Sequence, residues 1–424
     1  MQTLYNPTPE QWEQICERNT PDDQTIANRV ADIVNEVRNK GDEALRNYAQ
    51  MFDGATLTSL MLSNSEIEEA EAFVSEDVKH AIEVAIKNIS AFHEAQRTEG
   101  VDIHTMEGVR CMQRCVPIQR VGLYIPGGGA PLFSTVLMLA LPAQIAGCKE
   151  IVICTPQGKN GKIAPEILYA AKRCGVTRIC RIGGAQAIAA MAYGTESVPK
   201  VDKIFGPGNR YVTKAKQMLT NHVAIDMPAG PSEVLVMADH TARPAFVAAD
   251  MLSQAEHGAD SQAMLVCTSA DFAKEVEQEV ERQAKLLSRT TSVEQSLSHS
   301  RIIVLPTRHD LINFANCYAA EHLIISMEQP WDIAQEITAA GSIFIGNYSP
   351  ESAGDYASGT NHTLPTSGWA RSFSGVNLDS YMRKITYQEL TEEGLRSLAP
   401  TITAMANAEG LDAHAAAVTI RLHN

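Results

Sequence analysis

Two series of short apolar runs, each run followed by a helical stretch, limit the possible folds of this chain more than any other feature. The first series has its runs at 121–125, 151–154, 179–182 and 201–205. The second series has its runs at 233–237, 263–267, 301–305, 322–325 and 342–345. Short apolar strands that alternate with helices indicate parallel sheets covered by helices on both faces. We therefore predict an α/β protein with two similar parallel-sheet domains side by side.

The two ends of the chain have a helical pattern instead. Val30, Ile33, Val34 and Val37 keep the spacing of one helix face, and a second apolar face runs through 78–93. The tail from Thr386 onward also has helical spacing. The sequence therefore predicts helical extensions before and after the two sheet domains.

Charge and cysteine content exclude several classes of protein. With 35 Lys and Arg against 50 Asp and Glu, the formal net charge is −15, which argues against nucleic acid as the main partner. The longest apolar stretches, such as 136–143, are far shorter than the roughly 20 residues of a membrane-spanning helix. The N-terminus lacks the basic and apolar regions of a signal peptide. The nine cysteines form no CxxC pair, so we expect reduced thiols in a cytoplasmic protein.

Three glycine-rich segments lie where a strand of the first series gives way to a helix. They are 127–130, 183–186 and 206–209. Backbone N–H groups at such a turn can bind an anion, and the helix dipole adds to the attraction. Glycine at these positions is also explained by turn geometry alone, so each segment by itself leaves both interpretations open.

Polar residues in the second series suggest a site. Gln254 and His257 share a helix face and could hold a metal, although a His near a helix C-terminus also interacts with the dipole. Glu321 and His322 open a strand and could act as base and water activator, or simply be solvated. Adjacent strand residues point to opposite faces, so we expect no direct hydrogen bond between these two side chains.

A long polar loop follows the last strand of the second series, after Asn347. It contains Asp355 and His362. Open parallel sheets bind ligands at the carboxyl ends of their strands, so we expect this loop to be functional. Glu409 and His414 lie close to the end of the chain.

Six long segments, taken together and in order, resemble the histidinol dehydrogenase family. They are 122–128 (GLYIPGG), 201–209 (VDKIFGPGN), 226–234 (DMPAGPSEV), 252–258 (LSQAEHG), 321–323 (EHL) and 354–362 (GDYASGTNH). The resemblance spans nearly the whole chain. It implies a cytoplasmic, homodimeric enzyme that oxidises L-histidinol to L-histidine through an aldehyde, with two NAD, one water and one zinc ion per subunit.

The resemblance also implies roles for individual residues. The implied zinc ligands are Gln254, His257, Asp355 and His414. The same four, together with Ser232, His322, His362 and Glu409, are the implied substrate contacts. The implied NAD contacts are Tyr124, Gln186 and Asn209. Glu321 and His322 match the acid–base pair, and Glu409 and His414 reach the active site of the other subunit.

The resemblance further implies two Rossmann-like domains with defined limits. The expected parts are an N-terminal extension at 1–20, a substrate and zinc domain at 21–120 with 232–375, an NAD-binding domain at 121–231, and a helical C-terminal segment at 376–424 that reaches the partner. Two alternatives remain open. One is a different NAD-dependent dehydrogenase that uses a cysteine nucleophile, for which Cys111 and Cys148 are the candidates. The other is a metal- or nucleotide-binding protein without catalysis.

Overall fold

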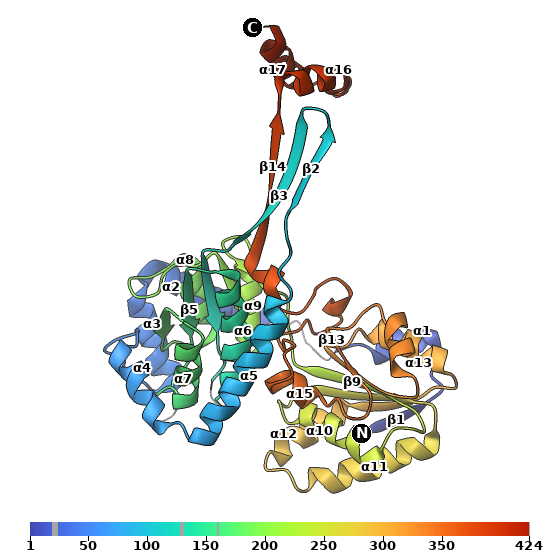
Figure 1. The fold of residues 1–424 in the computed structure, drawn as a ribbon. Coiled ribbons are helices and arrows are strands. Elements are labelled where there is room, and N and C mark those ends of the chain that lie inside the picture. Colours follow the sequence, from blue (N-terminus) through green and yellow to red (C-terminus); the bar gives the residue numbers. More distant parts are fainter. Residues whose placement is uncertain (19–23, 128–130, 159–160, 424) are drawn as a thin grey trace.

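The computed structural model describes residues 1–18, 24–127, 131–158 and 161–423. Within these residues the chain forms two α/β lobes and an arm that projects away from both (Figure 1). The first lobe surrounds the five-stranded sheet, the second lobe surrounds the six-stranded sheet, and the arm contains the three-stranded sheet. The predicted α/β class with two parallel-sheet domains is therefore confirmed.

The first lobe has a parallel sheet with the strand order β6-β5-β4-β7-β8. Its strands are β4 (Arg120–Tyr124), β5 (Glu150–Cys154), β6 (Arg178–Cys180), β7 (Lys203–Phe205) and β8 (Ala224–Ile225). The helices that follow these strands are α6 (Phe133–Ala146), α7 (Pro165–Arg173), α8 (Gly184–Tyr193) and α9 (Arg210–Met218). The order reverses at β4, which has β5 on one side and β7 on the other. Such a switch point opens a crevice at the carboxyl ends of the strands.

The N-terminal helices also pack on the first lobe. They are α2 (Gln24–Lys40), α3 (Asp42–Tyr48), α4 (Asn64–Ala70) and α5 (Glu76–Glu94). Val30 and Val34 of α2 share a core with Ile188 of α8, and Ile82 and Ile89 of α5 share another with α6. The predicted grouping of 21–120 with 232–375 is therefore wrong for these helices. Their amphipathic faces were recognised, but periodicity does not say which sheet an apolar face will cover.

The second lobe repeats the strand order of the first and adds one edge strand. Its order is β1-β11-β10-β9-β12-β13, and all pairs are parallel. The strands are β1 (Gln2–Tyr5), β9 (Glu233–Ala238), β10 (Gln262–Cys267), β11 (Arg301–Val304), β12 (His322–Ser326) and β13 (Ser342–Ile345). Its helices are α1 (Pro9–Ile15), α10 (Pro244–Ala255), α11 (Ala270–Ala284), α12 (Thr290–His299), α13 (Arg308–Tyr318), α14 (Pro330–Glu336) and α15 (Glu351–Tyr356). Because β1 pairs with β11, the segment predicted as a separate extension at 1–20 belongs, as far as it is described, to this lobe.

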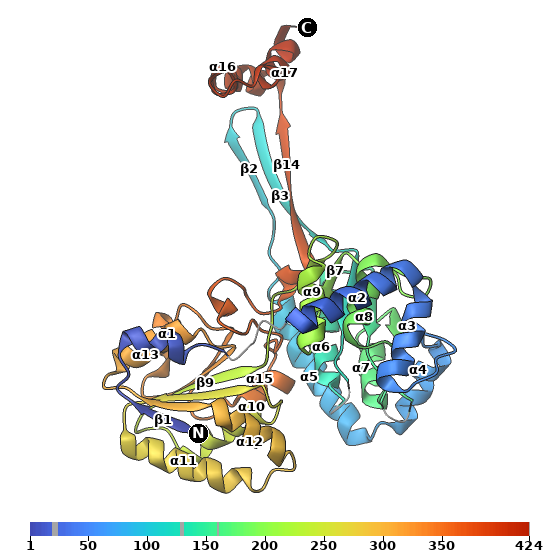
Figure 2. The same ribbon diagram turned by 180° about the vertical axis from the view of Figure 1, so that it is seen from behind.

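The arm is an antiparallel sheet with two helices at its tip (Figures 1 and 2). Its strands are β2 (Val101–Met106), β3 (Val109–Pro117) and β14 (Met382–Leu390), and its helices are α16 (Glu392–Ala408) and α17 (Asp412–His423). The helix predicted from Thr386 is wrong as far as Leu390, because these residues pair along their whole length with β3. That partner is distant in sequence, so local periodicity does not reveal it.

Across the described ranges, no helix combines the length and apolar character that a membrane span requires.

Candidate active site

Residues predicted for catalysis and metal binding meet at the amino ends of β9 and β12, on the side of the second lobe that faces the first. His322 is the first residue of β12, and His257 lies two residues beyond the C-terminus of α10. After β13, the chain runs back along the sheet, so Asp355 of α15 reaches the amino end of β12, 3.7 Å from His322. The prediction of a site at the carboxyl ends of these strands is therefore wrong. The long loop leaves from that edge, but α15 carries its polar residues to the opposite one.

His322 is a buried, neutral imidazole. Its Nδ1 lies 3.3 Å from the carbonyl oxygen of Glu233, and because a carbonyl only accepts, Nδ1 carries the proton. Its Nε2 then has the free lone pair, and this buried atom has no hydrogen-bond partner in the described structure. Burial lowers the pKa of His322 to about 4, against an opposing effect of Asp355. The ring can therefore accept a proton at Nε2 at neutral pH.

Glu321 lies beside His322 without bonding to it. Its Oε2 is 3.7 Å from His322 Nδ1, in agreement with the predicted lack of a hydrogen bond. The same oxygen accepts a hydrogen bond from the backbone N–H of Glu233 at 2.9 Å. Burial raises the pKa of Glu321 well above its usual range, and the hydrogen bond from Glu233 opposes this effect. A carboxyl group in such a place is a stronger base once it is ionised.

Gln254 and His257 present free ligand atoms from the end of α10. The ring Nδ1 of His257 donates to the carbonyl of Ser253 at 2.9 Å, so Nε2 is the ring atom left for a metal. The helix-end contact and the metal interpretation are thus compatible. Gln254 is fully buried, and neither polar atom of its amide has a partner within the described residues. An unpaired buried polar group costs about 1–3 kcal/mol, so a ligand is expected there.

Glu351 is a site residue that the sequence reasoning missed. It lies one turn before Asp355 on α15, and the two carboxylates share a face. Ligand atoms of His257, Glu351 and Asp355 all lie within 4.8 Å of one another, a spacing that could hold a metal ion. Glu351 is buried, and its carboxylate oxygens find no hydrogen-bond partner in the described chain. The i, i+4 pair of acids after Pro350 is the signal that could have revealed it.

These donors fit a zinc ion. Imidazole nitrogen and carboxylate oxygen are common zinc ligands, whereas the amide of Gln254 is an unusual one. Ligand atoms of His257, just beyond α10, and of Glu351 and Asp355 on α15 share one small volume, and the buried carboxylate oxygens of Glu351 have no partner among the described residues. Metal ligation is the simplest physical reason for keeping such atoms together without partners.

His362 connects the site to the first lobe. Its Nδ1–H donates to the carbonyl of Asp355 at 2.9 Å, and its Nε2 lies 3.3 Å from the hydroxyl of Thr135 on α6. Arg210, at the start of α9, forms a second bridge with Asp260 at 3.1 Å. The amino edge of the second sheet therefore faces the carboxyl edge of the first.

The predicted NAD contacts lie at that carboxyl edge of the first lobe. Tyr124 ends β4, and its hydroxyl accepts a hydrogen bond from the N–H of Gly184 at 3.1 Å. Gln186 lies in the first turn of α8, and Asn209 caps α9. Gly206 has a φ of +121°, and a Cβ there would lie 2.1 Å from the Tyr124 carbonyl oxygen, so only glycine fits this turn.

The glycine segments at 183–186 and 206–209 connect strands to helices as predicted. Residues 128–130 of the segment at 127–130 lie outside the described residues. A buried ion pair holds the second of these turns in place. Lys216 lies 2.5 Å from Asp226 and also donates to the Gly206 carbonyl, while Asp226 accepts from the Gly206 N–H.

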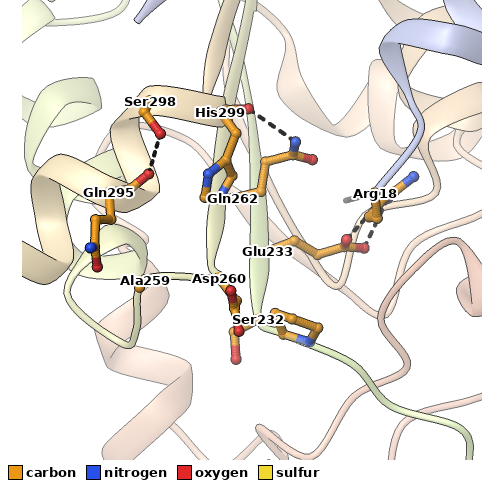
Figure 3. A pocket seen from close by; sticks show the side chains of 10 residues that line it. Arg18, Ser232, Glu233, Ala259, Asp260, Gln262, Gln295, Ser298 and His299 are labelled. Carbon is orange, nitrogen blue, oxygen red and sulfur yellow. Dashed lines mark hydrogen bonds and ion pairs between the residues drawn. The ribbon is translucent and has the colours of Figure 1, made fainter. Parts of the chain in front are cut away.

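Ser232 lines a cavity of about 300 Å³ directly before β9 (Figure 3). It precedes Glu233, whose backbone contacts both Glu321 and His322. Ser232 therefore lies next to the catalytic candidates.

Two predicted residues are far from this cluster in the same chain. Glu409 directly follows α16 as its C-cap and His414 lies on α17, both at the tip of the arm and exposed. Figures 1 and 2 show this tip at the opposite end of the molecule from α10 and α15. Within the described part of the chain, His414 does not join His257 and Asp355.

The cysteine candidates lie elsewhere. Cys111 is part of β3 in the arm. Cys148 follows α6, and burial raises the pKa of its thiol to about 12, which makes it a poor nucleophile at neutral pH. The geometry gives no support to a dehydrogenase with either thiol as nucleophile.

Comparisons with known proteins agree with the resemblance seen in the motifs. The family model described as histidinol dehydrogenase matches residues 16–422. A histidinol dehydrogenase of Bacteroides fragilis is 56% identical over 423 residues, which cover 100% of this chain and 99% of the relative. One of Escherichia coli is 53% identical over 403 residues, with 94% and 92% covered. The crystal structure of histidinol dehydrogenase from Elizabethkingia anophelis matches with a TM-score of 0.97 at 51% identity, covering 100% of this chain and 98% of that one.

Proposed function

Because the chain belongs to the histidinol dehydrogenase family, we propose that it is a zinc-dependent enzyme that oxidises L-histidinol to L-histidine through histidinal, with two NAD. Family membership makes the chain an oxidoreductase; the cofactors, the two steps and the residue roles belong to the proposal. One observation carries it most. A buried neutral histidine, a buried carboxyl group and a set of metal-type donors meet where the two lobes face each other.

His322 serves as the base in this proposal. Its Nε2 takes the proton of the alcohol as the first oxidation proceeds, and takes a proton again in the second. Its Nδ1–H stays bonded to the Glu233 carbonyl, which keeps the ring in the required tautomer. The burial that lowers the pKa of His322 keeps the ring free of a proton before each step.

Glu321 acts only in the second oxidation, in which the aldehyde is converted to the acid. There its carboxylate takes a proton from water, so that the oxygen can add to the carbonyl carbon. The Glu233 N–H holds one carboxylate oxygen, which leaves the other for water. A base on each side of the substrate explains why one site can perform both oxidations.

Gln254, His257 and Asp355 are the proposed zinc ligands of this chain, and His414 of the partner subunit is the fourth. When bound, zinc supplies a positive template that orients the imidazole and amine of the substrate. Ser232 and His362 are the further substrate contacts from this chain, with Glu409 of the partner subunit. Tyr124, Gln186 and Asn209 are the proposed NAD contacts, and NAD when bound accepts a hydride in each oxidation.

The arm supports a homodimer. Its sheet exposes apolar side chains that a monomer has no reason to present to water, namely Val101, Ile103, Met106, Ile385 and Tyr387. The tip of the arm adds Met405 on α16, Leu411 between the two helices and Ile420 on α17. A second copy of the chain would cover these groups, and the tip could then reach the other subunit's site. The nine cysteines form no CxxC pair, which favours reduced thiols, and we propose a cytoplasmic location on that basis.

The proposed reaction has a fixed stoichiometry. We expect two NADH to form for each histidinol consumed by the zinc-loaded protein, with free histidine as the product. Absorbance at the NADH band and quantification of histidine by chromatography measure both quantities in one sample. One NADH per histidinol with accumulated aldehyde would contradict the four-electron reaction, and no NADH at all would contradict the activity itself.

A mixture of two inactive variants tests the shared site. His414→Ala removes a ligand from the tip, and His257→Ala removes one from the second lobe. If the site is built across the dimer, each mixed dimer has one site with both lesions and one site with none. After re-association of equal amounts, about half of the dimers are mixed, so activity should recover to about a quarter of native. The measurement is NADH formation after exchange of subunits.

A matched mixture controls for this result. When Gln254→Ala is mixed with His257→Ala, both lesions lie in the second lobe, and every site in a mixed dimer retains one of them. This mixture should stay inactive. If the His414→Ala mixture also stays inactive after verified exchange, the site is not shared.

A further inference from the structure

The backbone of one residue, Glu233, contacts both catalytic candidates. The N–H of Glu233 donates to Glu321 Oε2 at 2.9 Å, and its carbonyl accepts from His322 Nδ1 at 3.3 Å. The contact with Glu321 is the shorter one. A shift of the Glu233 backbone therefore acts on Glu321 through the closer of the two contacts.

The side chain of Glu233 is itself fixed from two sides. It is 1% exposed, and its carboxylate receives a two-pronged contact from Arg18, with Nε 2.8 Å from Oε2 and Nη2 2.9 Å from Oε1. The N–H of Ser367 donates to the same Oε1 at 3.1 Å. Figure 3 shows Arg18 entering from the N-terminal segment and meeting Glu233 end to end. Two parallel charge-assisted bonds fix direction as well as distance.

Arg18 is held as firmly as the carboxylate that it binds. Its guanidinium donates to the carbonyls of Cys16 and Tyr318, both at 2.7 Å. It also stacks on the ring of Tyr318, 3.7 Å from the centroid. Tyr318 ends α13 three residues before Glu321, and its hydroxyl donates to Gln262 of β10 at 2.7 Å. Arg18 therefore connects the N-terminal segment, the end of α13 and the start of β9.

We propose that Arg18 is a positioning residue that fixes Glu321 for water activation by holding the backbone of Glu233 in place through its side chain. This inference rests on the proposed function, because it concerns the second oxidation of that reaction. Without Arg18, Glu233 is a buried carboxylate that lacks its cationic partner, so its side chain has to move toward water. Such a movement shifts the Glu233 backbone and loosens its N–H contact with Glu321. His322 depends less on this backbone, because its ring is also packed against Phe344, with 5.9 Å between ring centroids.

Arg18→Ala separates positioning from general stability. We expect the second oxidation to slow by about 10²-fold, the loss typical of a displacement of about 1 Å, and the first oxidation to slow by less than about tenfold. Histidinal should then accumulate and be captured by a trapping reagent in single-turnover experiments. Arg18→Lys keeps the charge but loses the fork, so the same imbalance should appear in a smaller form. Arg18→Lys can still be used to test the proposal if Arg18→Ala folds poorly.

Added methylguanidinium supplies a second readout. Arg18 lines the cavity of about 300 Å³ beside Ser232, so removal of its side chain leaves an open route for a small planar cation (Figure 3). We expect methylguanidinium to speed up the second oxidation of Arg18→Ala by at least about tenfold, because it can form the same two parallel hydrogen bonds to the Glu233 carboxylate. It should leave Arg282→Ala unchanged, because Arg282 only forms an exposed pair with Glu279.

The outcomes are distinct. Equal slowing of both oxidations would mean that Arg18 serves only the fold, and native behaviour of Arg18→Ala would mean that it serves neither. Both results overturn the inference while leaving the proposed function standing. If the unmodified protein forms no NADH from histidinol, the proposed function fails, and this inference fails with it.

Discussion

Replacement of His322 with alanine should slow both oxidations of histidinol by about 10²–10⁴-fold, the usual cost of losing a general base. The structure gives the physical reason. His322 is buried, and its Nδ1–H donates to the Glu233 carbonyl. Its Nε2 carries a lone pair without a hydrogen-bond partner among the described residues, and this atom lies beside the proposed metal site. Each oxidation of the proposed reaction releases a proton from an oxygen atom, so we expect the same ring to act in both. Stopped-flow measurement of NADH formed from histidinol, and separately from histidinal, follows the two steps.

His309→Ala is the matched control for this variant. His309 is an exposed histidine on α13 of the same lobe, and its loss should leave both rates at the native level. The zinc content and thermal unfolding of His322→Ala should stay close to native, since the ring is not among the proposed ligands. If His322→Ala oxidised histidinol at the native rate, the base would have to be a different group.

Glu321→Gln should affect only the second oxidation. The amide keeps the shape of the carboxyl group, and its oxygen still accepts the hydrogen bond from the Glu233 N–H. It cannot take a proton from water, so oxidation of the aldehyde should slow by about 10²–10⁴-fold while the alcohol is oxidised at nearly the native rate. Histidinal should then be detectable with a trapping reagent.

Glu328→Gln controls for the loss of one carboxylate from the same lobe, at the opposite end of β12 from Glu321. Glu328 is exposed and lies two residues beyond β12. This variant should make histidine normally. Histidine formation by Glu321→Gln at the native rate would assign water activation to another group.

The sheets could be predicted from the sequence, because their strands are buried and short. Strands such as β9 and β10 are buried at every position, and the apolar run at 263–267 records this directly. The arm could not be predicted in the same way. β14 is exposed along most of its length, and its strand conformation depends on pairing with β3, hundreds of positions earlier in the sequence. The residues around β14 in the sequence therefore give no sign that it pairs with β3.

The candidate site was predicted in part. His322 and Asp355 were identified through motifs, and the structure brings them within 3.7 Å. Their location at the amino edge was missed, because the strand order of the sheet says nothing about the path of the loop after β13. Glu351 was missed because an acid without a motif resembles a surface residue. Arg18 was missed because its partner Glu233 lies 215 residues away, and only the folded chain brings them together.

The arm has a consequence for the life of a newly made chain. A three-stranded sheet with water on both faces has little apolar burial of its own to stabilise it. Until a partner covers it, the arm is the part of the chain most open to proteases and to wrong association with other nascent chains. In the proposed homodimer, association of two chains is the step that completes folding, so the abundance of the protein in a cell would depend on how quickly two new chains meet.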